Sequence, residues 1–141
     1  MRKHLKSTLF LIAVSFIIFS GCKKHDDGLP ITIVQTATAF DEETSTSTGT
    51  FTTSGCIQTS GTYVMDAIFV ADSFYCTNKL IAPEGTFTTD MKCSATTMTG
   101  SWQILSGDGR YKRLNGGGTL VMTTPGGVDV ETLTGKVFFH H

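Results

Sequence analysis

The sequence predicts an all-β protein, folded as a single antiparallel β-barrel of about eight strands. Three observations favour this class. Turn signals recur at intervals of about eight to twelve residues. Apolar and polar residues alternate between them, and Thr and Gly are abundant while no segment after the N-terminus shows a convincing helical period. A β-sandwich is the alternative, because it has the same spacing of strands and turns.

A positively charged and then apolar segment opens the chain. Arg2, Lys3 and Lys6 precede an apolar run over residues 9–19. The run is shorter than the about 20 residues that a membrane-spanning helix needs, and small residues follow it. We therefore interpret residues 1–21 as a cleaved signal peptide.

The signal peptide leads into Ser20-Gly21-Cys22, which resembles the lipobox of bacterial lipoproteins. The resemblance implies cleavage before Cys22, a diacylglycerol on its thiol and a further acyl chain such as palmitate on its amine. Two or more acyl chains hold a protein stably on a membrane. We therefore expect Cys22 to anchor the protein in the bacterial cell envelope, as an outer-membrane lipoprotein that faces the periplasm or the cell surface.

Residues 22–30 are expected to be the lipidated cysteine and a flexible tether. The charged residues 23–27 resemble the signal that sends some Bacteroidetes lipoproteins to the cell surface, and a solvated linker explains them equally well. All 12 acidic residues follow the signal peptide but three of the 11 basic ones lie within it, which leaves a net charge of −4. This charge argues against nucleic acid as a partner.

The barrel domain is expected over residues 31–141. The predicted strands lie at 31–41, 48–53, 57–70, 101–105, 119–123, 128–134 and 135–139, with a further hairpin between 74 and 93. A three-residue loop at Pro125-Gly126-Gly127 would put Met122 and Val130 on the inner face and leave Asp129 and Glu131 outside.

The hairpin between residues 74 and 93 suggests a disulfide. If Glu84 and Gly85 are the central turn residues, Cys76 lies directly opposite Cys93, at a Cα separation that a disulfide can bridge. The inward face would then hold Cys76, Leu80, Phe87, Met91 and Cys93. The oxidising compartment favours such a bridge.

Cys56 is then most simply a small buried apolar residue. A zinc site is the rival interpretation, but structural zinc usually needs four N or S ligands, and no histidine lies between residues 26 and 139. No metal and no cofactor are expected.

The stretch from Gly100 to Leu120 resembles a glycine-rich signature of bacterial proteins related to the allene oxide cyclase and dirigent barrels. In that signature a Trp-containing strand runs into Gly-x-Gly, Tyr, Leu and Gly-x-Gly-Thr; the matching residues are Trp102, Gly107, Gly109, Tyr111, Leu114, Gly116, Gly118 and Thr119. The resemblance covers about half of the chain and implies a barrel, but a fold does not by itself define an activity. Apart from the resemblance, the run of three glycines allows a bulge, and Tyr111 and Leu114 are expected to plug one end of the barrel.

The search for catalytic groups leaves one weak candidate. Without a histidine between residues 26 and 139, the expected barrel domain has no base for a Ser-His-Asp or Cys-His arrangement. Asp66 interrupts an apolar strand, and it would be a general acid or base if it faced the barrel interior. A solvent-facing or ion-paired Asp66 explains the same pattern.

Two functions are therefore consistent with the sequence. The favoured one is a non-catalytic, lipid-anchored envelope barrel that binds a small apolar ligand or an envelope partner, or serves structurally. The alternative is a cyclase- or isomerase-like enzyme that acts on a small hydrophobic substrate with Asp66 as acid or base. A solidly packed barrel would favour the first; the aromatic residues expected to fill it are Phe51, Phe69, Phe87, Trp102 and Phe138.

Overall fold

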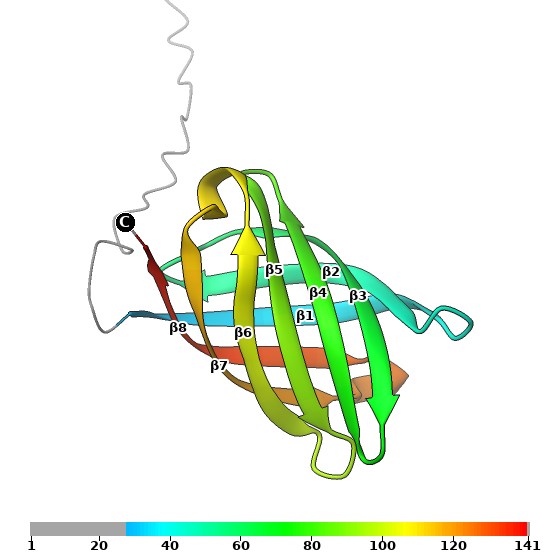
Figure 1. Cartoon of the computed structure of the whole chain (residues 1–141). Coiled ribbons are helices and arrows are strands. Elements are labelled where there is room, and N and C mark those ends of the chain that lie inside the picture. Colours follow the sequence, from blue (N-terminus) through cyan, green and yellow to red (C-terminus); the bar gives the residue numbers. More distant parts are fainter. Residues whose placement is uncertain (1–27, 141) are drawn as a thin grey trace, which may run out of the picture.

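The protein is a closed antiparallel barrel in which each of the eight strands pairs with its neighbours in the chain and β8 returns to β1 (Figure 1). This computed structural model describes residues 28–140. The predicted all-β barrel is confirmed, and the sandwich is excluded. The strands are β1 (Leu29–Asp41), β2 (Thr46–Gly55), β3 (Ser60–Val70), β4 (Ser73–Ala82), β5 (Gly85–Ser94), β6 (Thr99–Gly107), β7 (Leu114–Thr123) and β8 (Val130–Phe139).

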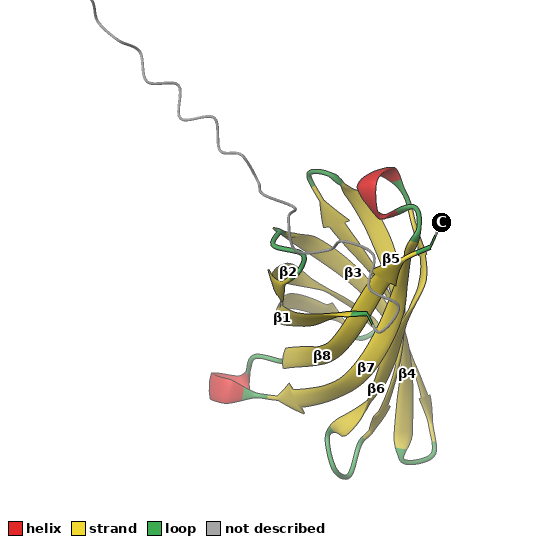
Figure 2. Cartoon of the chain, turned by 90° about the vertical axis from the view of Figure 1, so that its left-hand side faces the viewer, coloured by secondary structure: helices red, strands yellow, loops and turns green. Residues whose placement is uncertain are grey.

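Two short 3₁₀ turns interrupt the connections, as Figure 2 shows. They are η1 (Gly109–Tyr111), between β6 and β7, and η2 (Pro125–Gly127), between β7 and β8. The strand β1 begins at Leu29, two residues before the predicted start, so it includes the end of the expected tether. The predicted signal peptide and Cys22 lie outside the described residues.

Alternation along each strand separates the inside of the barrel from the outside, because successive side chains point to opposite faces. In β5, for example, Phe87, Thr89, Met91 and Cys93 are buried, and the residues between them are not. The predicted inward face of the β4–β5 hairpin is therefore confirmed. Of the aromatic residues expected inside, Phe51, Phe87 and Trp102 are buried, whereas Phe69 is 64 % exposed and Phe138 is 37 % exposed.

One end of the barrel, here called the plugged end, is filled by stacked aromatic rings. The ring of Phe87 lies edge-on to Phe51, with 6.1 Å between centroids, and edge-on to Tyr111, at 5.1 Å. Tyr111 comes from η1 and is fully buried, and Leu114 is 5 % exposed. The expectation that Tyr111 and Leu114 close one end is confirmed.

Glu84 fastens this plug to the β4–β5 turn. Its Oε2 accepts hydrogen bonds from the hydroxyls of Tyr111, at 3.1 Å, and Thr59, at 3.0 Å. The backbone N–H of Arg110 donates to the carbonyl oxygen of Glu84, at 3.2 Å. These hydrogen bonds join three connections of the plugged end, which hold residues 56–59, 83–84 and 108–113.

Close backbone packing explains two of the glycines in the second half of the chain. A Cβ on Gly118 would collide with the carbonyl oxygen of Thr134 in β8, and a Cβ on Gly135 would collide with that of Gly117 in β7. The indole N–H of Trp102, in β6, donates to the same Thr134 oxygen at 3.2 Å. The glycines therefore allow β7 and β8 to pack tightly beside Trp102.

Candidate functional site

The barrel interior contains a group of polar side chains with buried atoms that lack a hydrogen-bond partner in the described part of the chain. Seven buried side-chain atoms lack a partner among the described residues: Gln35 Oε1 and Nε2, Tyr63 Oη, Asn78 Oδ1 and Nδ2, Thr89 Oγ1 and Glu131 Oε2. We call these five residues the interior polar cluster. Buried polar groups in natural proteins are nearly always hydrogen-bonded, so each exception asks for an explanation.

The strand register brings four of the five residues together in two pairs. Gln35 in β1 lies directly opposite Glu131 in β8, and Asn78 in β4 lies directly opposite Thr89 in β5. Opposite residues have Cβ atoms about 4.5–5.5 Å apart. Gln35, Asn78 and Thr89 are fully buried, and Glu131 is 3 % exposed. The side chains of the interior polar cluster therefore come from the barrel wall itself, from strands β1, β3, β4, β5 and β8.

Glu131 is the only carboxylate in the cluster. Burial raises the pKa of Glu131 to about 7, and the negative charge of Asp129 acts in the same direction, while the backbone N–H of Glu131 opposes them. Burial raises the pKa of Tyr63 to about 12, the side chain of Ser47 acts in the opposite direction, and Glu131 raises it further. A carboxyl group with a pKa near neutrality can exchange a proton or meet a positive charge at physiological pH.

The position of Glu131 corrects a sequence prediction. We expected Glu131 outside, because a three-residue loop would pair Met122 with Val130. In the structure β8 begins at Val130, the connection is longer, and Met122 pairs with Glu131. A one-residue slip in register moves every side chain of a strand to the other face. Glu131 therefore points inward, and sequence reasoning missed it.

Asp66, the predicted acid or base, lies on the outer face of β3. It is exposed, and its Oδ1 accepts a hydrogen bond from the hydroxyl of Thr46 at 3.0 Å. Its strand neighbours on the same face are also exposed, Val64 to 40 % and Ile68 to 66 %. The structure therefore agrees with the solvent-facing alternative, and Asp66 does not line the barrel interior.

The predicted disulfide between Cys76 and Cys93 is also wrong, because both are free, buried thiols. The β4–β5 turn is centred on Pro83 and Glu84, with Ala82 opposite Gly85, so Cys76 faces Met91. Proline favours the first central position of such a turn because its φ is already suitable. The two cysteines thus share the inner face but are offset by two residues, where Cα atoms lie beyond the range of a disulfide.

We expect Cys76 and Cys93 to resist thiol reagents in the folded protein. Burial raises the pKa of Cys76 to about 12 and also raises the pKa of Cys93, with Glu131 contributing in both cases. The thiolate is the reactive form. Peptide mass mapping after alkylation at pH 8 should find both residues unmodified in native protein and fully modified in urea. A peptide in which Cys76 is linked to Cys93 would contradict this result.

Cys56 lies on the connection between β2 and β3, where it is partly buried against the hydrophobic core. Its backbone N–H donates to the carbonyl oxygen of Pro30 at 3.1 Å. The described residues contain no group of three or more His, Cys, Asp or Glu side chains that could hold a metal ion.

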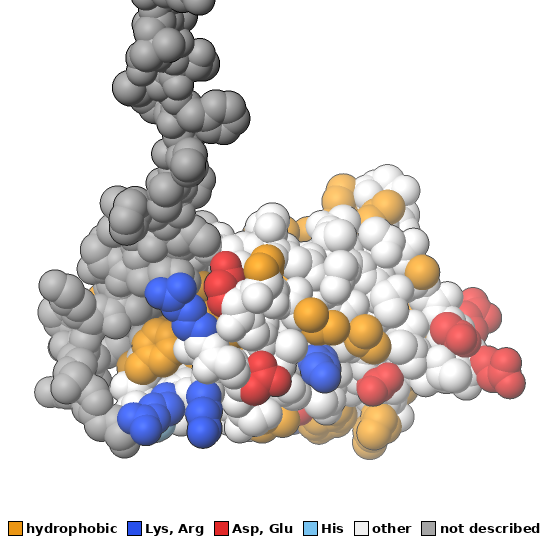
Figure 3. All heavy atoms as spheres, turned by 90° about the horizontal axis from the view of Figure 1, so that it is seen from above, with side chains coloured by type: hydrophobic (Ala, Val, Ile, Leu, Met, Phe, Trp, Pro, Cys, Tyr) orange, Lys and Arg blue, Asp and Glu red, His pale blue; other side chains and the backbone are white. Residues whose placement is uncertain are grey.

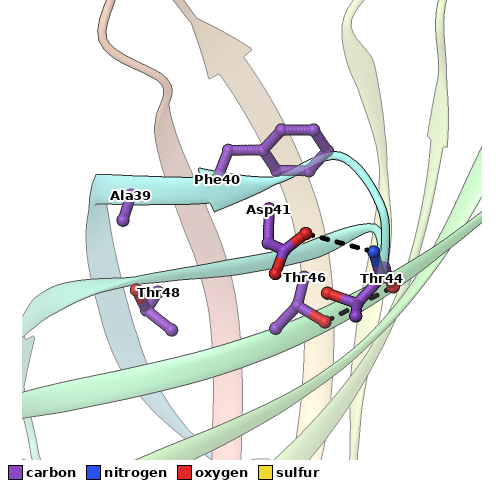
Figure 4. Close-up of a pocket in the computed structure, with 6 residues that line it drawn as sticks. All are labelled: Ala39, Phe40, Asp41, Thr44, Thr46 and Thr48. Atoms are coloured by element: carbon purple, nitrogen blue, oxygen red, sulfur yellow. Dashed lines mark hydrogen bonds between the residues drawn. The ribbon is translucent and has the colours of Figure 1, made fainter.

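A pocket of about 310 Å³ lies outside the barrel, next to the turn of the β1–β2 hairpin (Figure 4). Its polar groups already have partners within the hairpin: Asp41 Oδ1 accepts hydrogen bonds from the backbone N–H groups of Glu43, at 2.9 Å, and Thr44, at 3.2 Å. The hydroxyl of Thr46 donates to the carbonyl oxygen of Thr44 at 3.4 Å. The polar groups of this pocket therefore stabilise a turn, and the pocket is a weaker candidate for a binding site than the barrel interior.

No protein-family model, curated protein or solved structure matches the chain. Over residues 28–140 no helix has the length and apolar character needed to cross a membrane. Function must therefore be inferred from the residues themselves.

Proposed function

We propose that the protein is a lipid-anchored barrel of the bacterial cell envelope that binds a small, largely apolar molecule in its interior without transforming it. The observation that carries this proposal is the interior polar cluster, with seven buried atoms that have no hydrogen-bond partner among residues 28–140. A ligand with an apolar body and a few polar groups would bury its body among the surrounding core residues and complete these hydrogen bonds.

The energetic cost of the cluster supports a role beyond folding. An unsatisfied buried polar group costs about 1–3 kcal/mol, whereas an apolar residue of similar size at the same site would add to stability. Five such residues therefore lower the stability of this small barrel considerably. Proteins retain costly arrangements of this kind mainly where function needs them.

The proposed anchor is compatible with access to the interior. The strand β1 enters the barrel at the plugged end, since Leu29 pairs with Val137 near the end of β8. Cys22 precedes Leu29 by seven residues, a span of at most about 25 Å when extended. A lipid on Cys22 would therefore hold the plugged end near the membrane and leave the opposite end of the barrel free to meet ligands.

A second candidate is an isomerase- or cyclase-like enzyme, the activity associated with barrels that the glycine-rich stretch resembles. One observation favours it: Glu131, whose pKa lies at about 7, replaces Asp66 as a possible acid or base. Binding without chemistry remains the preferred proposal, because burial raises the pKa of the thiols that interact with Glu131, Cys76 and Cys93, which makes them poor nucleophiles.

Native mass spectrometry tests the proposal. The full chain carrying Cys22→Ala, expressed in an envelope-exporting bacterium, should retain a co-purifying small molecule that is released on denaturation. A bare polypeptide mass, with or without lysate added back, would contradict interior binding and favour a structural role.

Asn78→Leu is the matched variant for this test. Leu has the branched shape of Asn, with methyl groups in place of both unsatisfied amide atoms, so we expect the variant to be at least as stable as the wild type. It should lose the bound molecule. Retention of the same mass at the same occupancy would show that the ligand binds elsewhere.

A further inference from the structure

We infer that the interior site selects a small organic cation, an amine with an apolar body, whose ammonium group pairs with the Glu131 carboxylate and the amide oxygen of Gln35. This inference rests on the proposed function and specifies its ligand. It follows from the charges inside the barrel, the charges at one barrel end and the hydrogen-bonding capacity of the cluster.

The interior has negative charge and no positive charge to balance it. Every Lys and Arg side chain between residues 28 and 140 is exposed, so none of them neutralises Glu131 inside the barrel. The other ionisable groups that act electrostatically with Glu131 are Asp129, Tyr63, Cys76 and Cys93, and each of these can only be neutral or negative. An anionic ligand would be repelled here, whereas a cation would supply the missing counter-charge.

The end of the barrel that leads to Glu131 is acidic. We define the acidic end by the turns at residues 42–45, 71–72, 95–98 and 124–129, which lie opposite the plugged end. Glu131 is the second residue of β8 and so lies just inside this end. The turns and their flanking residues supply Asp41, Glu42, Glu43, Asp72 and Asp129.

Lys and Arg side chains gather toward the other end of the molecule. Figure 3 shows acidic side chains at the end to which the β1–β2 hairpin projects, and most of the visible basic ones at the opposite end. The basic residues of the plugged end include Arg110, Lys112 and Arg113, which lie in the connection between β6 and β7. A field of this polarity raises the local concentration of cations at the acidic end.

Large apolar side chains are exposed beside these acids. Ile68 and Phe69, at the end of β3, are 66 % and 64 % exposed, and Phe40, at the end of β1, is 53 % exposed. The acidic end thus combines negative charge with apolar surface. This combination suits a molecule that carries an ammonium group on an apolar body.

The cluster also has the acceptors that an ammonium group needs. An ammonium group has three donors and no acceptor, and Glu131 Oε2 and Gln35 Oε1 are unpartnered acceptors on directly opposite residues. The described residues lack the three or more metal-ligating side chains that would favour a divalent ion. An organic cation is therefore the better match than a metal.

Binding of an amine should become tighter as the pH rises through about 7, because only the ionised carboxylate of Glu131 forms the pair. Simple alkylamines stay protonated over this range, as the Lys ammonium group does. The affinity of an uncharged ligand of the same shape should fall or stay constant as the pH rises, because Glu131 remains buried and protonated in that complex.

The test compares three probes with one apolar body: 4-phenylbutylamine, 4-phenylbutanol and 4-phenylbutyrate. Binding to the full chain carrying Cys22→Ala is followed by the fluorescence of Trp102, the only tryptophan, which lines the inner face of β6. At pH 8 we expect the amine to bind about tenfold or more tightly than the alcohol, and the butyrate to bind least. Glu131→Gln should remove the advantage of the amine over the alcohol.

Equal binding of the three probes, or strongest binding of the butyrate, would overturn the choice of a cation while leaving interior binding in place. An amine advantage that persists in Glu131→Gln would also overturn it, by placing the cation elsewhere. If none of the probes binds at millimolar concentration, the inference fails, and the mass spectrum of the co-purified protein decides separately whether the interior binds any ligand.

Discussion

Replacing Glu131 with Gln should stabilise the protein at pH 8 by on the order of 3 kcal/mol. The pKa of Glu131 rises from 4.5 to about 7 on folding, mainly through burial, and each pKa unit corresponds to about 1.4 kcal/mol. Because the folded state holds this proton more tightly than the unfolded state, wild-type stability is fully present below pH 4.5 and falls as the pH rises through about 7.

Urea unfolding at pH 4.5 and pH 8, followed by Trp102 fluorescence, measures this effect. The two proteins should have similar stability at the lower pH, and the difference should appear at the higher one. Asp66→Asn is the control, since Asp66 is exposed on the outer face, and it should leave the loss seen in wild type intact. An equal loss of stability in wild type and Glu131→Gln would contradict the burial of Glu131.

Truncating Phe87 to Ala should cost about 3–5 kcal/mol of unfolding free energy. Phe87 is fully buried, and its ring bridges Phe51 and Tyr111 at the plugged end. The fixed strands around it leave little scope for collapse into the cavity. Thermal and urea unfolding of the variant report the loss directly.

Ile68→Ala is the matched control, because Ile68 is 66 % exposed on the outer face of β3. Its stability should stay within about 0.5 kcal/mol of wild type. A loss below about 1 kcal/mol for Phe87→Ala would mean that the aromatic stack does not support the barrel.

The fold class could be predicted because it depends on patterns that tolerate small errors. The β4–β5 hairpin illustrates this. Its register was predicted two residues out, yet the inward face was right, because a shift of two positions keeps every side chain on its own face. The disulfide between Cys76 and Cys93 depended on the register itself, and it was wrong.

The sequence prediction missed the candidate site because of a one-residue error in the register of β8. Counting from a three-residue loop at Pro125 places Glu131 outside, whereas the connection between β7 and β8 is longer than three residues. Counting back from Leu133 and Val137, the buried residues of β8, puts Glu131 on the inner face.

The same count finds other members of the cluster. Gln35 continues the inward series of Ile31 and Ile33, and Asn78 lies between the inward residues Cys76 and Leu80. Polar residues at inward positions were thus the available signal. Asp66 resembles an inward-facing acid in the sequence because its outward neighbours are also apolar. Exposed apolar residues on a strand cannot be distinguished from buried ones by sequence pattern alone.

The central claim is that an unpaired carboxyl group titrates inside the barrel, and the most direct measurement is the pH titration of the side-chain carboxyl carbon of Glu131 by ¹³C NMR. Glu131→Gln identifies the resonance. A midpoint near pH 7 in the ligand-free protein, lowered when 4-phenylbutylamine is added, is the result expected from the geometry. A midpoint near 4.5 that the amine does not move would place Glu131 in water and contradict the interior site.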